Sequence, residues 1–299
     1  DTATTEIYTL SLHDALPIYH LDIAPVQEGF YVKGAAHCDW GMKNRLSRLF
    51  DPKSGNTVML AFDHGYIMGA TAGLERMDVT IAPLCRYADV LMATRGAIRS
   101  CIPPTVHNAI CLRATHDASV LIDDMSTGNG VGADMEAAIR MNASAVAIQC
   151  FIGGAGEARS LETLCRAVDA GERYGIPVLG VTAVGKEMAR TTQYFLLATR
   201  MLAELGASFV KTYYCDDFEK VVAACPVPIV IAGGKKLPEL EALEMAYKAI
   251  QEGAHGVDMG RNIFQSDCPA GMAQAIGKVV HEGYTPQQAY EVYETVKHA

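Results

Sequence analysis

The chain has 299 residues, of which 50 % are hydrophobic and 20 % are charged, and its formal net charge at pH 7 is −9. This length and composition predict one large domain with a substantial apolar core. The acidic balance and the lack of a basic stripe disfavour nucleic acid as a partner, whereas anionic metabolites can still bind at local basic groups. No apolar run approaches the roughly 20 residues of a membrane-spanning helix, so we expect no membrane segment.

The first 18 residues, DTATTEIYTLSLHDALPI, lack the basic start and the continuous apolar stretch of a signal peptide. They resemble one reading frame of a common short-read sequencing adapter, most clearly over YTLSLHDALPI. We therefore expect residues 1–18 to be an assembly artefact that replaces the true start, so that His13 and Asp14 carry no function. Residues 19–56 form an extension, in which CDWGMKNRLSRLF predicts an amphipathic helix that covers the barrel bottom or meets another subunit.

From residue 57 onward, short apolar runs alternate with helix-like segments whose apolar residues recur at i, i+3 and i+4. Eight runs predict strands: TVMLAFDHG, DVLMATRG, AICLRA, SAVAIQCFIG, GIPVLGVTAVG, ASFVKTYYC, VPIVIAGG and HGVDMGRN. Eight such βα units over residues 57–299 predict a single (β/α)8 TIM barrel as the catalytic domain. The rival fold is a doubly wound sheet, but the G-x-G-x-x-G turn that usually follows its first strand is missing.

The strand ASFVKTYYC carries a lysine, Lys211, in its middle. By alternation, Phe209, Lys211 and Tyr213 share one face. If that face is the barrel interior, burial disfavours the ammonium and frees the amine to attack a carbonyl. We therefore interpret Lys211 as a Schiff-base lysine. The alternative is a structural lysine that is ion-paired with a carboxylate such as Asp63.

The last two strands end in the Gly-rich turns IVIAGGKK and VDMGRNIFQ, at the place where this fold often binds phosphate. The backbone amides of Gly233, Gly234 and Gly260 can approach an anion closely, and Arg261 can add a charge-assisted hydrogen bond. We therefore predict a phosphate site here. The alternative is that these glycines only shape tight turns.

Other polar residues lie near the ends of predicted strands. Asp63 and His64 are candidate proton-handling groups, although a single His is more often structural than catalytic. Arg95, Arg113 and Lys186 are candidates for contact with substrate oxygens. The nine His show no H-x-H or H-E-x-x-H spacing, so we expect no metal site.

The nine cysteines form no C-x-x-C pair and are scattered through the predicted strands and helices. This pattern indicates a reduced, disulfide-free, cytoplasmic protein whose thiols are structural. Cys215, which follows Lys211 closely, is the one thiol that we keep as a candidate reactive group.

Five segments together resemble the class I aldolase family of the archaeal fructose-bisphosphate type: AFDHGY, TRGAIRS, FVKTYY, CPVPIVIAGGKKLPE and GVDMGRNIFQS. The resemblance runs from about Phe30 to the C-terminus. IVIAGGKKLPE and DMGRNIFQ are most similar to a branch of this family that processes the phosphorylated autoinducer-2 quorum-sensing signal by thiolase chemistry. The resemblance implies that Lys211 is the Schiff-base lysine and that Asp63 is the acidic residue of the first strand. It implies a phosphate site at Gly233, Gly234, Gly260 and Arg261.

Two positions depart from the family pattern. Ala183 stands where the aldolases carry a Tyr acid/base, and Phe151 stands where the thiolase branch is expected to carry a Tyr. The first departure disfavours simple cleavage of a sugar bisphosphate and favours the thiolase branch. If the second alignment holds, any role of that hydroxyl is missing here.

The resemblance therefore implies an acyltransferase that moves an acetyl group from a phosphorylated diketone to coenzyme A, giving acetyl-CoA and dihydroxyacetone phosphate. It implies a homo-oligomer with no bound cofactor, for which coenzyme A is a co-substrate. Two alternatives stay open: a class I aldolase that acts on a phosphorylated sugar through Lys211, and a non-catalytic barrel that binds a phosphosugar. No local motif marks a coenzyme A site.

Overall fold

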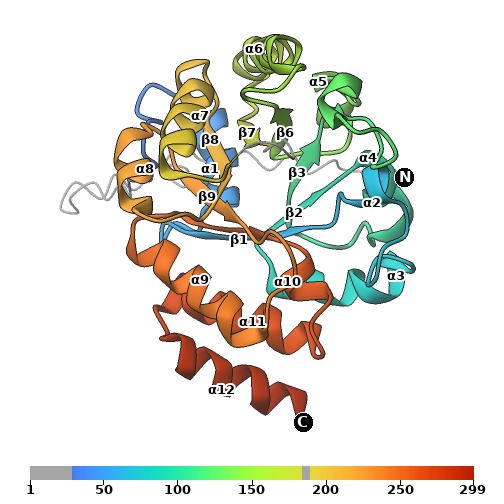
Figure 1. Cartoon of the computed structure of the whole chain (residues 1–299), viewed down its shortest axis with the longest axis vertical. Helices are drawn as coiled ribbons and strands as arrows, with labels where there is room; N and C mark the ends of the chain where they lie inside the picture. The colour runs from blue at the N-terminus through green and yellow to red at the C-terminus, as the bar shows by residue number, and fades with distance from the viewer. Residues whose placement is uncertain (1–28, 184–188) are drawn as a thin grey trace, which may run out of the picture.

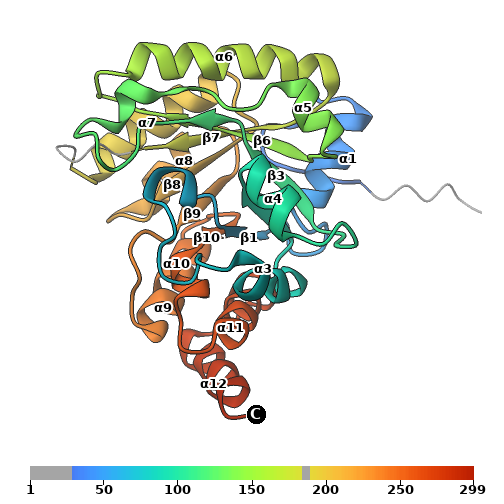
Figure 2. The same ribbon diagram turned by 90° about the vertical axis from the view of Figure 1, so that its right-hand side faces the viewer.

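The computed structural model describes residues 29–183 and 189–299, which form a closed barrel of parallel strands wrapped by helices (Figures 1 and 2). Around the barrel the strands follow the order β1-β10-β9-β8-β7-β6-β3-β2. Their bounds are β1 (Thr57–Ala61), β2 (Val90–Ala93), β3 (Ala109–Arg113), β6 (Ala145–Cys150), β7 (Val178–Thr182), β8 (Phe209–Tyr213), β9 (Ile229–Ala232) and β10 (Gly256–Met259). The predicted (β/α)8 fold class is confirmed, and each of the eight predicted runs contains one barrel strand.

Helices connect the successive strands and cover the outside of the barrel. Their bounds are α1 (Trp40–Leu49), α2 (Gly65–Met68), α3 (Met77–Thr80), η1 (Ala82–Tyr87), α4 (Arg95–Cys101), α5 (Met135–Arg140), α6 (Glu157–Tyr174), α7 (Thr192–Glu204), α8 (Phe218–Ala224), α9 (Glu239–Gln251), α10 (Arg261–Phe264), α11 (Pro269–Glu282) and α12 (Pro286–Lys297). Figures 1 and 2 show α9, α11 and α12 packed together on one side of the barrel, with the C-terminus at its outer edge.

The barrel strands are buried on both faces, as parallel strands covered by helices must be. Alternate side chains fall into two apolar clusters because successive residues of a strand point to opposite faces. In β8, Phe209 belongs to the cluster inside the barrel, and Val210 belongs to the cluster between the strands and the helices. Lys211 therefore lies on the interior face.

The extension before β1 closes the end of the barrel where the strands begin. Leu46, Leu49 and Phe50 are each 1 % exposed and belong to the cluster inside the barrel. The ring of Phe50 packs edge-on against Phe209, the first residue of β8, with 5.5 Å between the ring centroids. Helix α1 thus closes the barrel opposite the end where the strands terminate.

Between β3 and α5 the chain departs from simple βα repetition. Two short strands, β4 (Thr115–His116) and β5 (Gly130–Val131), pair antiparallel, with η2 (Met125–Gly128) between them. The side chain of Asp124 caps η2 by accepting a hydrogen bond from the Ser126 amide at 2.9 Å. Strands of two residues are too short to show a periodic pattern, so the sequence did not predict this insertion.

The suggested artefact at residues 1–18 lies outside the described residues. Within 29–183 and 189–299, no helix is both long and apolar enough to cross a bilayer. All nine cysteines are free thiols.

We predict that Phe50→Ala destabilises the protein strongly, because it empties the space between α1 and the floor of the barrel. The expected loss is about 3–5 kcal/mol in the free energy of unfolding, measured by urea denaturation. Leu197→Ala is the control: Leu197 on α7 is 55 % exposed, so its loss should change stability by less than about 0.5 kcal/mol. Equal unfolding midpoints for Phe50→Ala and the wild type would contradict a structural role for α1.

Candidate active site

A cavity of about 240 Å³ opens at the C-terminal ends of the barrel strands, opposite α1. In this fold the loops after the strands form the active site. Seven of the eight residues predicted for the site line this cavity: Asp63, His64, Lys211, Gly233, Gly234, Gly260 and Arg261. The structure therefore brings together residues from the ends of β1, β8, β9 and β10.

Lys211 is almost completely buried inside the barrel and faces a carboxylate. Its Nζ atom lies 2.9 Å from Oδ2 of Asp258 on β10 and 3.6 Å from the sulfur of Met92 on β2. The ion-pair partner is therefore Asp258, whereas sequence analysis suggested Asp63. A signal for Asp258 was present: it is an acidic residue in the middle of an otherwise apolar strand, one alternation before Gly260.

The Asp258 side chain has no solvent exposure. Burial raises the pKa of this carboxyl, because the charged form loses its hydration, while the nearby charge of Lys211 opposes the shift. Its Oδ1 atom has no hydrogen-bond partner among the described residues. Asp258 is thus a carboxyl that can exchange a proton with the adjacent amine.

Asp63 is held by Arg113 of β3 instead of by Lys211. Nε and Nη2 of Arg113 lie 2.7 and 2.6 Å from Asp63 Oδ2. Burial by itself would raise the pKa of Asp63, but the charge of Arg113, with smaller contributions from His64 and Lys211, lowers it to about 2. Asp63 therefore remains an anion at neutral pH.

His64 is uncharged at neutral pH, unlike the neighbouring Asp63 and Arg113. Burial, together with the charges of Lys211 and Arg261, lowers its pKa to about 4 against the opposing effect of Asp63. Its Nδ1 atom lies 3.9 Å from Asp63 Oδ1, which is too far for a hydrogen bond. At neutral pH the imidazole is uncharged and lies beside the turn at Gly260.

The two Gly-rich turns lie side by side and are joined by Asn262. Its side-chain amide donates to the Gly233 carbonyl at 2.7 Å and accepts from the Leu237 amide at 2.8 Å. Gly234 has φ +67°, a region that favours glycine, and a Cβ at Gly260 would clash with the Ala61 carbonyl oxygen. Asn262 was not predicted from the sequence, although a polar residue directly after a Gly-Arg turn is a recognisable signal.

Arg261, directly after Gly260 in the turn that follows β10, has a side-chain N–H donor without an acceptor among the described residues. Its Nε atom is buried and has no hydrogen-bond partner among the described residues. A buried unpaired donor is costly, and a bound anion would satisfy it. This feature is compatible with the phosphate site predicted from the sequence.

A tyrosine from α2 also lines the cavity. The Tyr66 hydroxyl donates to Asp117 at 2.5 Å, and Asn129 donates to the other oxygen of Asp117 at 2.8 Å. Burial raises the pKa of Tyr66, and Asp117 raises it further against the charge of Arg113, so the hydroxyl stays protonated. This group was not predicted from the sequence, because Asp117 and Asn129 belong to the β4–β5 insertion.

The three cationic residues predicted to contact substrate oxygens lie at different places relative to the cavity. Arg113 lines the cavity but is bound to Asp63. Arg95 is exposed at the first residue of α4 and does not line the cavity. Lys186 lies outside the described residues.

The two positions that depart from the family pattern also differ in place. Ala183 lines the cavity after β7, the strand next to β8, and offers only a methyl group there. Phe151 is buried and does not line the cavity. Burial raises the pKa of the Cys215 thiol, which favours the protonated form, and Cys215 also lies outside the lining of the cavity.

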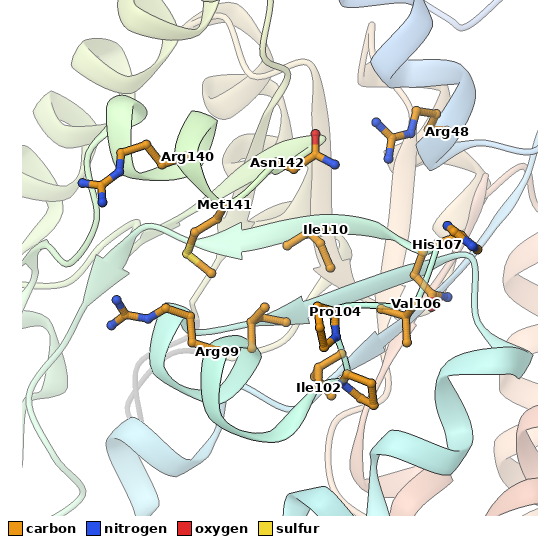
Figure 3. Close-up of a pocket in the computed structure, with 13 residues that line it drawn as sticks. Arg48, Arg99, Ile102, Pro104, Val106, His107, Ile110, Arg140, Met141 and Asn142 are labelled. Carbon is orange, nitrogen blue, oxygen red and sulfur yellow. The ribbon is translucent and has the colours of Figure 1, made fainter.

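A larger cavity of about 510 Å³ lies near the N-terminal ends of β3 and β6, beside α4 and α5. Figure 3 shows Arg99 and Arg140 on one side of it and Arg48 and His107 on the other. No carboxylate or lysine lines it, so it lacks the amine–carboxylate pair found at Lys211. Across residues 29–183 and 189–299, no group of three or more His, Cys, Asp or Glu side chains is arranged to hold a metal ion.

Residues 57–266 match the family model described as DeoC/LacD family aldolase. The chain is 54 % identical over 269 residues to the 3-hydroxy-5-phosphonooxypentane-2,4-dione thiolase of Escherichia coli K12, covering 90 % of this chain and 92 % of that protein. It is 53 % identical over 276 residues to an uncharacterized aldolase of Pasteurella multocida, covering 92 % and 94 %. An archaeal fructose 1,6-bisphosphate aldolase structure shares the fold, with a TM-score of 0.73 at 24 % identity over 81 % of this chain and 100 % of that chain.

We predict that His64 makes the protein less stable in mild acid. Between pH 6.5 and about 4 the unfolded chain binds a proton at His64 that the folded protein does not bind, so the free energy of unfolding falls as the pH falls. The expected contribution is about 3 kcal/mol, measured by urea denaturation at several pH values. His64→Asn should flatten the profile, whereas His298→Asn, at a side chain that is 73 % exposed, should not. Parallel profiles for the wild type and His64→Asn would contradict a neutral, buried His64.

Proposed function

Because the chain belongs to the DeoC/LacD aldolase family, we propose that it is a thiolase that transfers an acetyl group from 3-hydroxy-5-phosphonooxypentane-2,4-dione to coenzyme A through a Schiff base on Lys211. The observation that carries this proposal is the buried Lys211–Asp258 pair, which lines the same cavity as the two Gly-rich turns. Identities of 52 to 54 % to relatives named as this thiolase support the choice of substrate.

The substrate phosphate is bound by the turns after β9 and β10. The amides of Gly233, Gly234 and Gly260 approach its oxygens, and the unpaired Nε of Arg261 donates to it. The ketone carbon two bonds from the phosphate oxygen then lies against Lys211. Binding at the phosphate thus orients the carbonyl for attack by the amine.

Imine formation begins with proton transfer from Lys211 to Asp258. The carboxyl is 2.9 Å away and its pKa is raised by burial, so it accepts the proton and leaves a neutral amine. The amine attacks the ketone, the carbinolamine loses water, and a protonated imine remains. We assign this proton transfer to Asp258 in place of Asp63, whose pKa of about 2 fixes it as an anion beside Arg113.

Carbon–carbon cleavage then follows attack by the coenzyme A thiolate on the acetyl carbonyl. The tetrahedral intermediate collapses and breaks the bond between the acetyl carbon and the hydroxyl-bearing carbon, whose electron pair passes into the imine to give an enamine. This carbon takes up a proton, and water hydrolyses the imine. The products are acetyl-CoA and dihydroxyacetone phosphate, and Lys211 is regenerated.

Neutral groups complete the site. The His64 imidazole and the Tyr66 hydroxyl stay uncharged at neutral pH. The imidazole can hydrogen-bond a substrate oxygen, whereas the Tyr66 hydroxyl donates its proton to Asp117, so its oxygen can only accept. Ala183 supplies no acid/base hydroxyl, which favours a thiol acceptor over ordinary aldol cleavage. The mechanism requires no bound cofactor or metal ion and leaves Cys215 unused.

We also propose that the enzyme works as a homo-oligomer in the cytoplasm, in catabolism of the phosphorylated autoinducer-2 signal. The nine free thiols support a reducing compartment. Sedimentation velocity of the full chain tests the homo-oligomer, and a monomer at micromolar concentration would contradict it.

Borohydride reduction tests the Schiff base. With dihydroxyacetone phosphate present, the wild type should gain one covalent adduct, located at Lys211 by peptide mass spectrometry. Lys211→Arg keeps a cation beside Asp258 but cannot form the imine, so it should gain no adduct. Incubation with the diketone and coenzyme A should yield acetyl-CoA, and leaving out coenzyme A should stop cleavage of the diketone. Cleavage at the same rate without the thiol would support the aldolase alternative, and labelling of Lys211→Arg would remove the Schiff-base assignment.

The two aspartates should differ when each is replaced by asparagine. Asp258→Asn removes the proton acceptor, so we expect imine formation to slow by about 10²–10⁴-fold in single-turnover trapping. Asp63→Asn leaves Arg113 buried without its partner, so we expect a loss of about 3–5 kcal/mol in the free energy of unfolding. If borohydride trapped the imine of Asp258→Asn at the wild-type rate, Asp258 would not be the proton acceptor and another group would have to carry this role.

A further inference from the structure

We propose that coenzyme A docks on one arc of the cavity rim, formed by α2, the β4–β5 insertion and Arg95. This inference rests on the proposed thiolase function, which requires a thiol to reach the acetyl carbonyl, one carbon away from the substrate's imine carbon. The apolar rim is defined as Met68, Val120, Leu121 and Ile122.

The apolar rim is exposed and continuous with the active-site cavity. Met68 is 41 % exposed, and the three consecutive residues Val120, Leu121 and Ile122 are 49, 89 and 49 % exposed. Met68 and Val120 also line the cavity that contains Lys211. Grouped exposed apolar side chains beside a polar cavity mark a binding surface more often than single ones do.

The backbone holds the apolar rim in place. The Val120 amide donates to the Ile67 carbonyl at 3.2 Å and thereby joins the insertion to α2. At the base of the loop, the Ala118 amide donates to the Met125 carbonyl at 3.2 Å, and Gly128 packs so tightly on Ala118 that a Cβ would clash. These contacts fix the apolar side chains at the mouth of the cavity, so a ligand meets a formed surface.

Arg95 adds a positive charge to the arc formed by α2 and the β4–β5 insertion. The strands β1, β2 and β3 are consecutive in the barrel, and they are followed by α2, Arg95 and the β4–β5 insertion respectively. Arg95 is exposed, and among the described residues it makes no hydrogen bond or ion pair. The arc therefore offers apolar surface next to the cavity and a guanidinium group at the end of the strand between them.

Coenzyme A has the matching chemistry. Its pantetheine arm is a narrow chain with methyl and methylene groups that ends in the thiol, and its other end carries phosphates. With the arm on the apolar rim, the thiol enters the cavity and the phosphates meet Arg95. The turns proposed for the substrate phosphate follow β9 and β10, and β10 adjoins β1, whereas Arg95 follows β2. The two anionic groups therefore meet the ends of different strands and do not compete.

Steady-state kinetics with two thiols test this assignment. The double variant Leu121→Gln with Ile122→Gln should raise the KM for coenzyme A and for free pantetheine by about tenfold each. Arg95→Gln should raise the KM for coenzyme A by about tenfold and leave that for pantetheine unchanged, because pantetheine has no phosphate. Borohydride trapping at Lys211 should equal the wild type in both variants, which shows that the diketone site is intact.

Matched controls lie away from the arc. Leu197→Gln replaces an exposed leucine on α7, and Arg48→Gln replaces an exposed arginine on α1 at the other end of the barrel, so neither should change the KM for either thiol. An unchanged KM for coenzyme A in the rim and Arg95 variants would overturn the docking surface. A change of oligomeric state in the double variant with an unchanged KM would assign the apolar rim to a second copy of the chain instead. A wild type that labels at Lys211 but forms no acetyl-CoA would overturn the thiolase proposal itself.

Discussion

The buried ion pair between Lys211 and Asp258 is the interaction on which the rest of the site depends. Removing two charges from water costs several kcal/mol per ion, and only close pairing offsets this cost. A second pair, Asp63 with Arg113, lies in the same cavity. The four charges balance, while His64 stays neutral. Because Arg113 holds Asp63 as an anion, the other carboxyl is left free to exchange a proton with the amine.

The barrel makes this arrangement possible. Alternation along parallel strands sends Lys211 of β8 and Asp258 of β10 to the same interior space, with β9 between them. Phe50 and the apolar side chains of α1 fill the opposite end, so the polar groups gather where the strands terminate. Asn262 then ties the turn after β9 to the turn after β10. The rigid scaffold thus sets the distance between the amine and the two Gly-rich turns.

Much of the fold and of the candidate site was predictable from short-range sequence patterns. The site residues that were not predicted, or were predicted wrongly, have identifiable physical causes. The eight strands and the interior position of Lys211 follow from apolar periodicity, which is a local property. The sequence did not decide between Asp63 and Asp258 as the partner of Lys211, although an acidic residue within an apolar strand marked Asp258 as a candidate. Only the strand order and the position of Arg113 separate the two carboxylates. Arg95 was a candidate for contact with substrate oxygens, yet it begins α4 outside the cavity. The Tyr66–Asp117–Asn129 network depends on an insertion with very short strands.

The sequence by itself determined the fold class, the buried amine and the Gly-rich turns, because each is encoded by residues that are neighbours in the chain. Resemblance to a known family added the substrate class. Tertiary structure alone decided which carboxylate meets the lysine, which one is neutralised by an arginine, and which side chains form the mouth. The two ion pairs join residues about 50 positions apart, and the cavity lining joins segments from Ala61 to Arg261. Burial and pairing then set the protonation of each group, since both depend on what surrounds it in three dimensions.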